Sequence, residues 1–144
     1  MSGAKEPFYA LSFKFRKVLV PIDGSEYSLL ALDFALDMAQ RYGSKIVVLH
    51  VHSKGASEEK MAEAIMERAR KRASKFSSPV EYKVRAYDPS ESSLASEIVK
   101  EALEGGYDAV VMGARGTSIS EEVQIGSTAL AVVTGVPATI VLVR

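Results

Sequence analysis

Five short apolar runs alternate along the chain with four longer segments whose apolar residues recur at helical spacing. The apolar runs are Val18–Ile22, Lys45–Val51, Val80–Tyr87, Ala109–Met112 and Ala138–Val143. The segments between them are 26–42, 57–76, 94–102 and 126–134. Strands that alternate with helices through right-handed crossovers form a parallel sheet with helices on both faces. We therefore expect an α/β fold with a doubly wound, five-stranded parallel sheet.

The composition is that of an ordinary globular domain. With 144 residues, 47% of them hydrophobic, the chain is long enough for one domain with its own core. We expect an N-terminal arm over 1–15 and a single domain over 16–144. The 18 basic and 18 acidic residues cancel, so nothing in the charge favours nucleic acid or a membrane surface as a partner.

The chain has no cysteine, which excludes disulfides and thiolate chemistry. Its first residues lack the continuous apolar stretch of a signal peptide, and no segment reaches the length of a membrane helix. These features predict a cytoplasmic protein.

A glycine-containing loop follows the fourth apolar run. Gly113 and Gly116 end that run, and Gly126, Ser127 and Thr128 open the last helical segment, which gives the spacing G-x2-G-x9-G-S. We expect the first two glycines to allow positive φ and close approach of the backbone to a ligand. Free amides at the start of the helix attract an anion, and we expect that anion to be a phosphate group of the ligand. The loop matches neither a Walker A sequence nor the dinucleotide fingerprint GxGxxG.

This spacing resembles the nucleotide-binding signature of the universal stress protein family, in its ATP-binding, UspA-like branch. The resemblance extends over residues 17–144 and includes the first strand with Asp23-Gly24-Ser25. It implies an adenine nucleotide alpha hydrolase-like fold with the strand order 3-2-1-4-5. It further implies ATP, or ADP or AMP, as the ligand, with the adenosine near Asp23 and Ile46. The cofactor-binding residues expected from the loop and the resemblance together are Pro21, Ile22, Asp23, Gly24, Ser25, Ile46, Met112, Gly113, Arg115, Gly116, Gly126, Ser127 and Thr128.

The loop departs from many family members in its charge. After Gly116 it is neutral and then acidic, and Arg115 is its one cation. We therefore expect Mg²⁺ to accompany the phosphates, held with help from Ser127, Thr128 or Glu121.

Some of these residues have plainer interpretations. Asp23 and Ser25 could serve as helix N-caps and nothing more. His50 and His52 lie on one strand face and could hold a metal, although no third ligand is evident. The basic residues of the second helical segment favour a solvated helix face over a nucleic-acid surface.

The sequence predicts a nucleotide-dependent sensor or regulator of the stress response. One alternative is a slow ATP hydrolase, with Glu121 or Glu122 orienting water, but the loop has no lysine and no catalytic residue can be assigned. Another is a stress-related dimer that does not use nucleotide.

The final apolar run predicts a homodimer. Ala138–Val143 is apolar on both faces, and the implied strand order places it at the sheet edge. An unprotected edge can pair with a second copy of itself about a two-fold axis. The alternative is that residues 1–15 cover this edge within one subunit.

Overall fold

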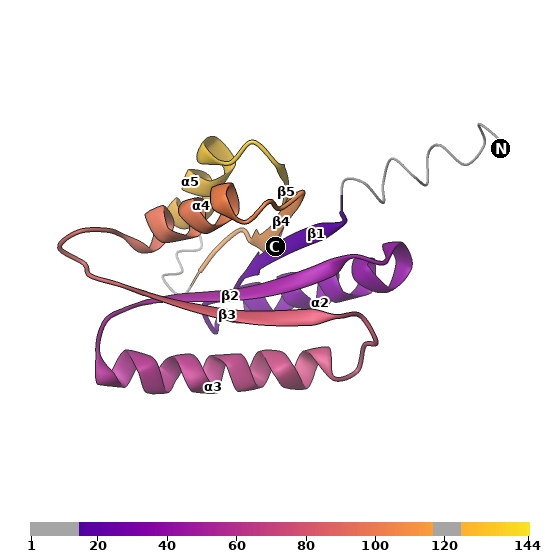
Figure 1. Cartoon of the computed structure of the whole chain (residues 1–144), viewed down its shortest axis with the longest axis horizontal. Helices are drawn as coiled ribbons and strands as arrows, with labels where there is room; N and C mark the ends of the chain where they lie inside the picture. The colour runs from indigo at the N-terminus through magenta and orange to yellow at the C-terminus, as the bar shows by residue number, and fades with distance from the viewer. Residues whose placement is uncertain (1–14, 117–124) are drawn as a thin grey trace.

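The computed structural model describes residues 15–116 and 125–144. Its sheet has five parallel strands in the order β3-β2-β1-β4-β5 (Figure 1), which confirms the predicted fold class and strand order. The strands, in chain order, are β1 (Lys17–Pro21), β2 (Lys45–Ser53), β3 (Val80–Tyr87), β4 (Ala109–Gly113) and β5 (Thr139–Val143).

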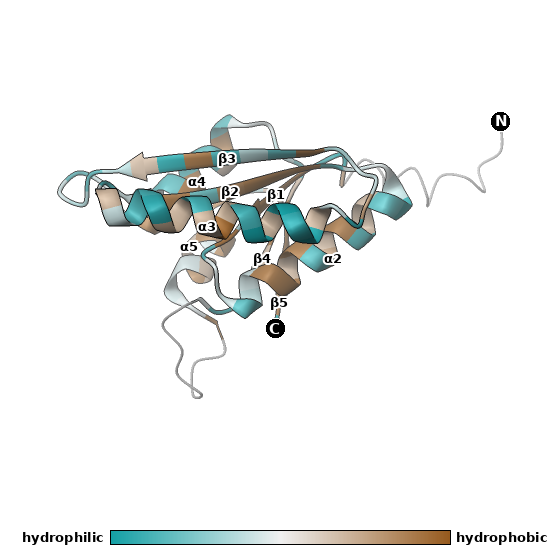
Figure 2. Ribbon diagram, turned by 90° about the horizontal axis from the view of Figure 1, so that it is seen from below, coloured by the Kyte–Doolittle hydropathy of each residue, from teal (hydrophilic) through white to brown (hydrophobic). Residues whose placement is uncertain are grey.

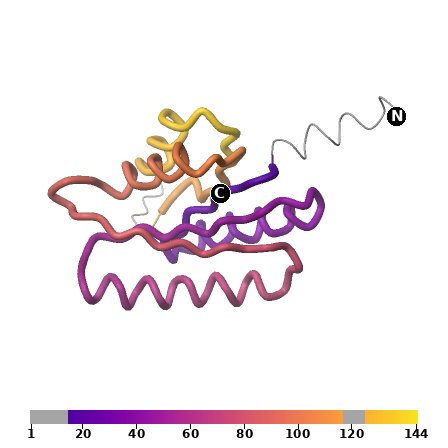
Figure 3. Tube along the Cα trace, in the orientation of Figure 1, coloured from indigo at the N-terminus to yellow at the C-terminus, as the bar shows by residue number. Residues whose placement is uncertain are grey.

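Four helices connect the strands and cover both faces of the sheet. They are α2 (Glu26–Tyr42), α3 (Ala56–Ala73), α4 (Leu94–Glu104) and α5 (Ser127–Gly135). Helices α2 and α3 pack on one face, and α4 and α5 pack on the other. The trace in Figure 3 shows α3 running along β3, while α4 and α5 lie together on the opposite side.

The two cores share the central strand. Val18 and Val20 face α2 and α3, whereas Leu19 between them faces α4 and α5, and all three are fully buried. A strand that is covered on both faces is apolar at every position, which explains the unbroken apolar run in this part of the sequence. The hydrophilic residues of α3 lie on its outward side (Figure 2).

Helix boundaries follow the local capping chemistry. Ser25 caps α2 and Ser93 caps α4, each by accepting a backbone hydrogen bond. Gly43, with φ of +71°, ends α2 as expected. Helix α3 begins at Ala56, with Gly55 at the N-cap and no side-chain capping bond. The Ser57 hydroxyl, in the first turn of this helix, donates to the Glu58 carboxylate.

The strand order reverses between β1 and β4, which pair with each other while the chain continues outward on either side. Loops that follow two such strands diverge and leave a crevice at the strand carboxyl ends. Within the described residues, no helix has the length and apolar character needed to span a membrane.

Candidate functional site

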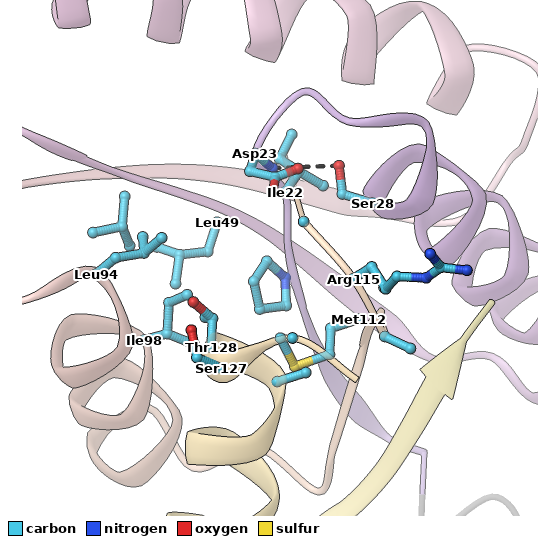
Figure 4. A pocket seen from close by; sticks show the side chains of 17 residues that line it. Ile22, Asp23, Ser28, Leu49, Leu94, Ile98, Met112, Arg115, Ser127 and Thr128 are labelled. Carbon is cyan, nitrogen blue, oxygen red and sulfur yellow. Dashed lines mark hydrogen bonds between the residues drawn. The ribbon is translucent and has the colours of Figure 1, made fainter. Parts of the chain in front are cut away.

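A pocket lies at the carboxyl ends of β1, β2 and β4, at the point where the strand order reverses. It brings together the loop after β1, the loop after β4, and the first turns of α4 and α5 (Figure 4). Ten of the expected site residues line it: Pro21, Ile22, Asp23, Met112, Gly113, Arg115, Gly116, Gly126, Ser127 and Thr128.

The turn after β1 is held by a small set of hydrogen bonds. Asp23 Oδ1 accepts the amide of Ser25 at 2.9 Å, and Ser25 Oγ accepts the amide of Ser28 at 3.2 Å. The Ser28 hydroxyl donates to the Ser25 carbonyl at 2.9 Å and accepts the Asp23 amide at 3.3 Å. One oxygen of Asp23 is thereby used within the turn, and Ser28, which was not predicted, becomes part of the pocket lining.

Gly113 and Gly116 lie where the chain passes close to itself, and neither has positive φ. The expectation of positive φ at these two positions is thus corrected. A Cβ on Gly113 would lie 2.9 Å from the backbone carbonyl carbon of Tyr27. A Cβ on Gly116 would lie 2.9 Å from Asp23 Oδ2, so the loop after β4 passes directly over the carboxylate of the loop after β1. The two predicted loops therefore meet.

The first turn of α5 faces the pocket. Gly126 is its N-cap with φ of −76° and ψ of 161°, and Ser127 and Thr128 follow as pocket-lining residues. The Gly126 amide donates to the Ala114 carbonyl at 2.6 Å, so it is not available to a phosphate as we had expected. The next amides have no intrahelical acceptor, because the first turn of a helix always leaves its donors unpaired.

Arg115 lines the pocket but extends towards α2. Its guanidinium lies 5.2 Å from the centre of the Tyr27 ring, a cation–π geometry. In Figure 4 the side chain points away from Ser127 and Thr128.

On the side of the pocket opposite Arg115, apolar side chains lie beside the hydroxyls of Ser127 and Thr128 (Figure 4). These apolar side chains are Leu49 and Val51 of β2 and Leu94 and Ile98 of α4, and we call these four residues the apolar subsite. None of the four was predicted, and neither were the lining residues Ala114 and Ala129. For Leu49 and Val51 a signal was available, because ligands bind at strand carboxyl ends and these residues lie in the second half of their strand.

Three expected residues do not line the pocket. Ile46 is fully buried at the amino end of β2, where it pairs with Val18 and packs under α2 and α3. The expectation that Ile46 meets the base is thus corrected, because the strand carries it away from the crevice. Gly24 and Ser25 turn away as well, Gly24 against Ile65 of α3 and Ser25 into its capping role.

The His50 side chain forms a hydrogen bond to the backbone of Ile22, which lines the pocket. The His50 Nδ1–H donates to the Ile22 carbonyl at 2.8 Å, and burial lowers the pKa of His50 although that hydrogen bond opposes the shift. His52 Nδ1 lies 2.7 Å from the Ser53 carbonyl, and the two rings stack at 5.9 Å. The described ranges contain no cluster of three or more His, Asp, Glu or Cys side chains suited to a metal.

Two parts of the sequence-based account lie outside the described residues. These are residues 1–14 of the expected arm and the loop segment 117–124, which contains Glu121 and Glu122.

The family model and the related sequences that match this chain all belong to one family. Residues 14–144 match the model of the universal stress protein family. A universal stress protein of Thermus aquaticus, encoded in the QAH/OAS sulfhydrylase 3′ region, is 28% identical over 138 residues, which is 90% of this chain and 99% of that protein. The universal stress protein YxiE of Bacillus subtilis is 28% identical over 135 residues, covering 78% and 88% of the two chains.

Solved structures share the fold. The universal stress protein UspA from Lactobacillus plantarum superposes with a TM-score of 0.79 at 23% identity, covering 90% of this chain and 98% of that one. Three other structurally similar universal stress proteins were solved with an adenine nucleotide. One holds cAMP, one from Archaeoglobus fulgidus holds dAMP, and one from Arabidopsis thaliana has AMP bound.

Proposed function

Because this chain belongs to the universal stress protein family, we propose that it binds an adenine nucleotide, foremost ATP, and acts as a nucleotide-dependent sensor or regulator in the stress response. The observation that carries the proposal is the pocket at the reversal of strand order. It brings together surfaces that suit the base, the ribose and the phosphates of a nucleotide. The apolar subsite suits a flat base, the Asp23 carboxylate suits ribose hydroxyls, and the amides that open α5 suit phosphate. No catalytic residue is part of the proposal.

The choice of adenine rests on related proteins. The nucleotides found in complexes with similar universal stress proteins, namely cAMP, dAMP and AMP, all contain this base. ATP is proposed because the G-x2-G-x9-G-S spacing of the sequence resembles that of the ATP-binding branch of the family.

We include Mg²⁺ in the proposal because of the charges that surround the phosphate region. Asp23 Oδ2 lies close to the backbone of Gly116, so a triphosphate placed along this loop would approach a carboxylate. A divalent cation would offset that repulsion, and the hydroxyls of Ser127 and Thr128 line the same part of the pocket. Mg²⁺ bound with ATP would reduce the repulsion between the negative phosphates and the Asp23 carboxylate.

Replacing Gly126 by valine tests the placement of the phosphates. A Cβ at this position would lie 3.6 Å from the Ala114 carbonyl oxygen, and φ of −76° suits valine, so the variant should fold. The side chain would occupy the space between α5 and the loop after β4. We expect ATP affinity to fall on the order of tenfold, equivalent to about 1.4 kcal/mol. Isothermal titration calorimetry measures it.

Thr134→Val is the matched control, since it introduces the same residue on the same helix. Thr134 is exposed, and its hydroxyl donates only to the helix carbonyls of Leu130 and Ala131 in the described structure. Equal ATP affinity in Gly126→Val and the parent would refute the placement.

The presence of Mg²⁺ is tested by the same titrations of the parent in EDTA. Chelation should weaken ATP binding more than AMP binding, and equal losses would argue against a bridging metal.

We also propose a homodimer formed through β5. In the described structure β5 pairs with β4 on one side, and all five of its residues are half-buried. Leu30 and Phe34 are exposed on α2, a helix that also contacts β5 on one face of the sheet. Leu130 and Val133 are exposed on α5, on the other face of the sheet. Apolar surface beside an open strand edge is typical of an isologous interface.

A further inference from the structure

Ion pairs with two buried carboxylates attach helix α4 to strand β3. Glu97 and Glu101 lie one helical turn apart and are 7% and 2% exposed. Arg85 of β3 bridges them: its Nη2 lies 2.9 Å from Glu97 Oε1, and its Nη1 lies 2.9 Å from Glu101 Oε1. We call these three residues the Arg85 cluster.

The other carboxylate oxygens of the cluster are also paired. Glu101 Oε2 accepts from Lys83 Nζ at 3.0 Å and from the Tyr107 hydroxyl at 2.8 Å. Glu97 Oε2 accepts from the Ser92 hydroxyl and from Lys100 Nζ. Burying the two carboxylates costs desolvation energy, which offsets much of the attraction to their partly exposed cations. The distinguishing property of this paired network is that it fixes the orientation of the groups that it joins.

Of the two elements joined by the Arg85 cluster, α4 forms part of the apolar subsite, and β3 pairs with β2, which forms the rest. Leu94 and Ile98 of α4 lie one turn apart, and Ile98 directly follows Glu97. On β2, Val51 is in register with Arg85 and Leu49 is in register with Lys83. A shift of α4 relative to β3 would therefore move Leu94 and Ile98 relative to Leu49 and Val51. Figure 4 shows Leu49, Leu94 and Ile98 together on this side of the pocket.

We propose that Arg85 is a positioning residue for the nucleotide base. By holding the carboxylates of Glu97 and Glu101, it sets the width of the apolar subsite and so the affinity for a flat aromatic base. This proposal rests on the proposed function, and it adds a residue that has no contact with the pocket in the described structure. Arginine suits the task because its rigid planar fork reaches two carboxylates at once, whereas lysine offers a single ammonium.

Arg85→Lys is the test, because it keeps the charge and removes the fork. Calorimetric titrations with adenosine, AMP and ATP should each show affinity reduced by about twofold to thirtyfold. The factor should be the same for all three ligands, since the phosphate region is unchanged. In Gly126→Val, by contrast, the loss should grow with the number of phosphates. Arg41→Lys is the matched control, because Arg41 forms an exposed pair with Asp37.

A second readout needs no ligand. In methyl NMR spectra, Arg85→Lys should shift the signals of Leu94 and Ile98 but leave Ile65, on the opposite face of the sheet, in place. If Arg85→Lys does not fold, Glu97→Gln should show the same uniform loss, because it weakens the same bridge and keeps an oxygen acceptor.

Three results would overturn the proposal. A lower melting temperature with unchanged affinities would mean that Arg85 only stabilises the fold. A loss that grows from adenosine to ATP would place its effect at the phosphates. A parent protein that binds none of the three ligands would reject the proposed function itself, which distinguishes that failure from the other two.

Discussion

Gly113 and Gly116 lack side chains at two places where the chain passes very close to itself. Gly113 lies against the backbone of Tyr27, and Gly116 lies over the carboxylate of Asp23. Both contacts join segments that are distant in sequence, so each glycine lets two elements approach more closely than a side chain would permit. A side chain at Gly113 would have to displace the Tyr27 backbone, whereas one at Gly116 would displace the Asp23 carboxylate.

Glu97 is the residue for which the structure makes the clearest prediction about pH. Hydrogen bonds from Ser92 and then from Arg85 lower its pKa from an ordinary 4.5 to about 2, although burial opposes the shift. Because the folded pKa lies below the unfolded one, the ionised carboxylate stabilises the fold above about pH 4.5. That contribution is lost as the pH falls towards 2. In Glu97→Gln, the decline of the unfolding free energy over this range should be smaller.

Urea unfolding at a series of pH values measures this difference. Glu63→Gln, which changes an exposed carboxylate of α3, serves as the control and should behave like the parent. The parent itself should lose some stability through Glu101 as well, whose pKa is lowered by hydrogen bonds from Tyr107, Lys83 and Arg85 against the effect of burial. Identical declines in Glu97→Gln and the parent would contradict the assignment.

Strand β5 is the element on which the proposed dimer depends. The Thr139 amide donates to Asp108 at the β4 side. Amides alternate in direction along a strand, so Val141 also faces β4, while Ile140 and Leu142 face outward. Proline at position 141 would therefore break the β4–β5 pair, whereas Leu142→Pro removes an outward donor and should dissociate the dimer.

Light scattering at micromolar concentration checks this prediction. The parent should have twice the 15.5 kDa mass of one chain, and Leu142→Pro should have the mass of one. Leu142→Ala shortens the same side chain but keeps the amide, so it should remain a dimer. A monomeric parent would reject the dimer, and a dimeric Leu142→Pro would reject pairing through this edge.

The helices and strands could be predicted from the sequence more fully than the residues that line the pocket or the contacts between elements. Unbroken apolar runs identify β1 and β4, because both of their faces are buried. The expectation for Ile46 rests on the family resemblance, but this residue lies at the amino end of its run, and the rule that ligands bind at strand carboxyl ends favours Leu49 and Val51 instead. Leu94 and Ile98 were expected only as part of a helix stripe, since the pattern of an amphipathic helix does not separate residues that face a pocket from those in a core. The pairing of Arg85 with Glu97 and Glu101 joins two elements, and spacing within either one gives no sign of it.

In the whole molecule, the order β3-β2-β1-β4-β5 places the two predicted loops side by side. Two helices on each face leave the carboxyl ends of the central strands open between α4, α5 and the turn into α2. The pocket thus follows from the topology, and its chemistry follows from the residues that end each strand. Binding of an adenine nucleotide in this pocket is the central claim.

Amide chemical-shift mapping with ATP and Mg²⁺ tests that claim most directly. On titration, a ¹⁵N-labelled chain should show its largest shifts at Asp23, Ile98, Gly116 and Ser127, which line the pocket. Ile46, at the far end of β2, should not shift. Absence of shifts at millimolar ATP, or shifts centred on the outer surface of α4 and α5 around Val99 and Ala131, would contradict the account.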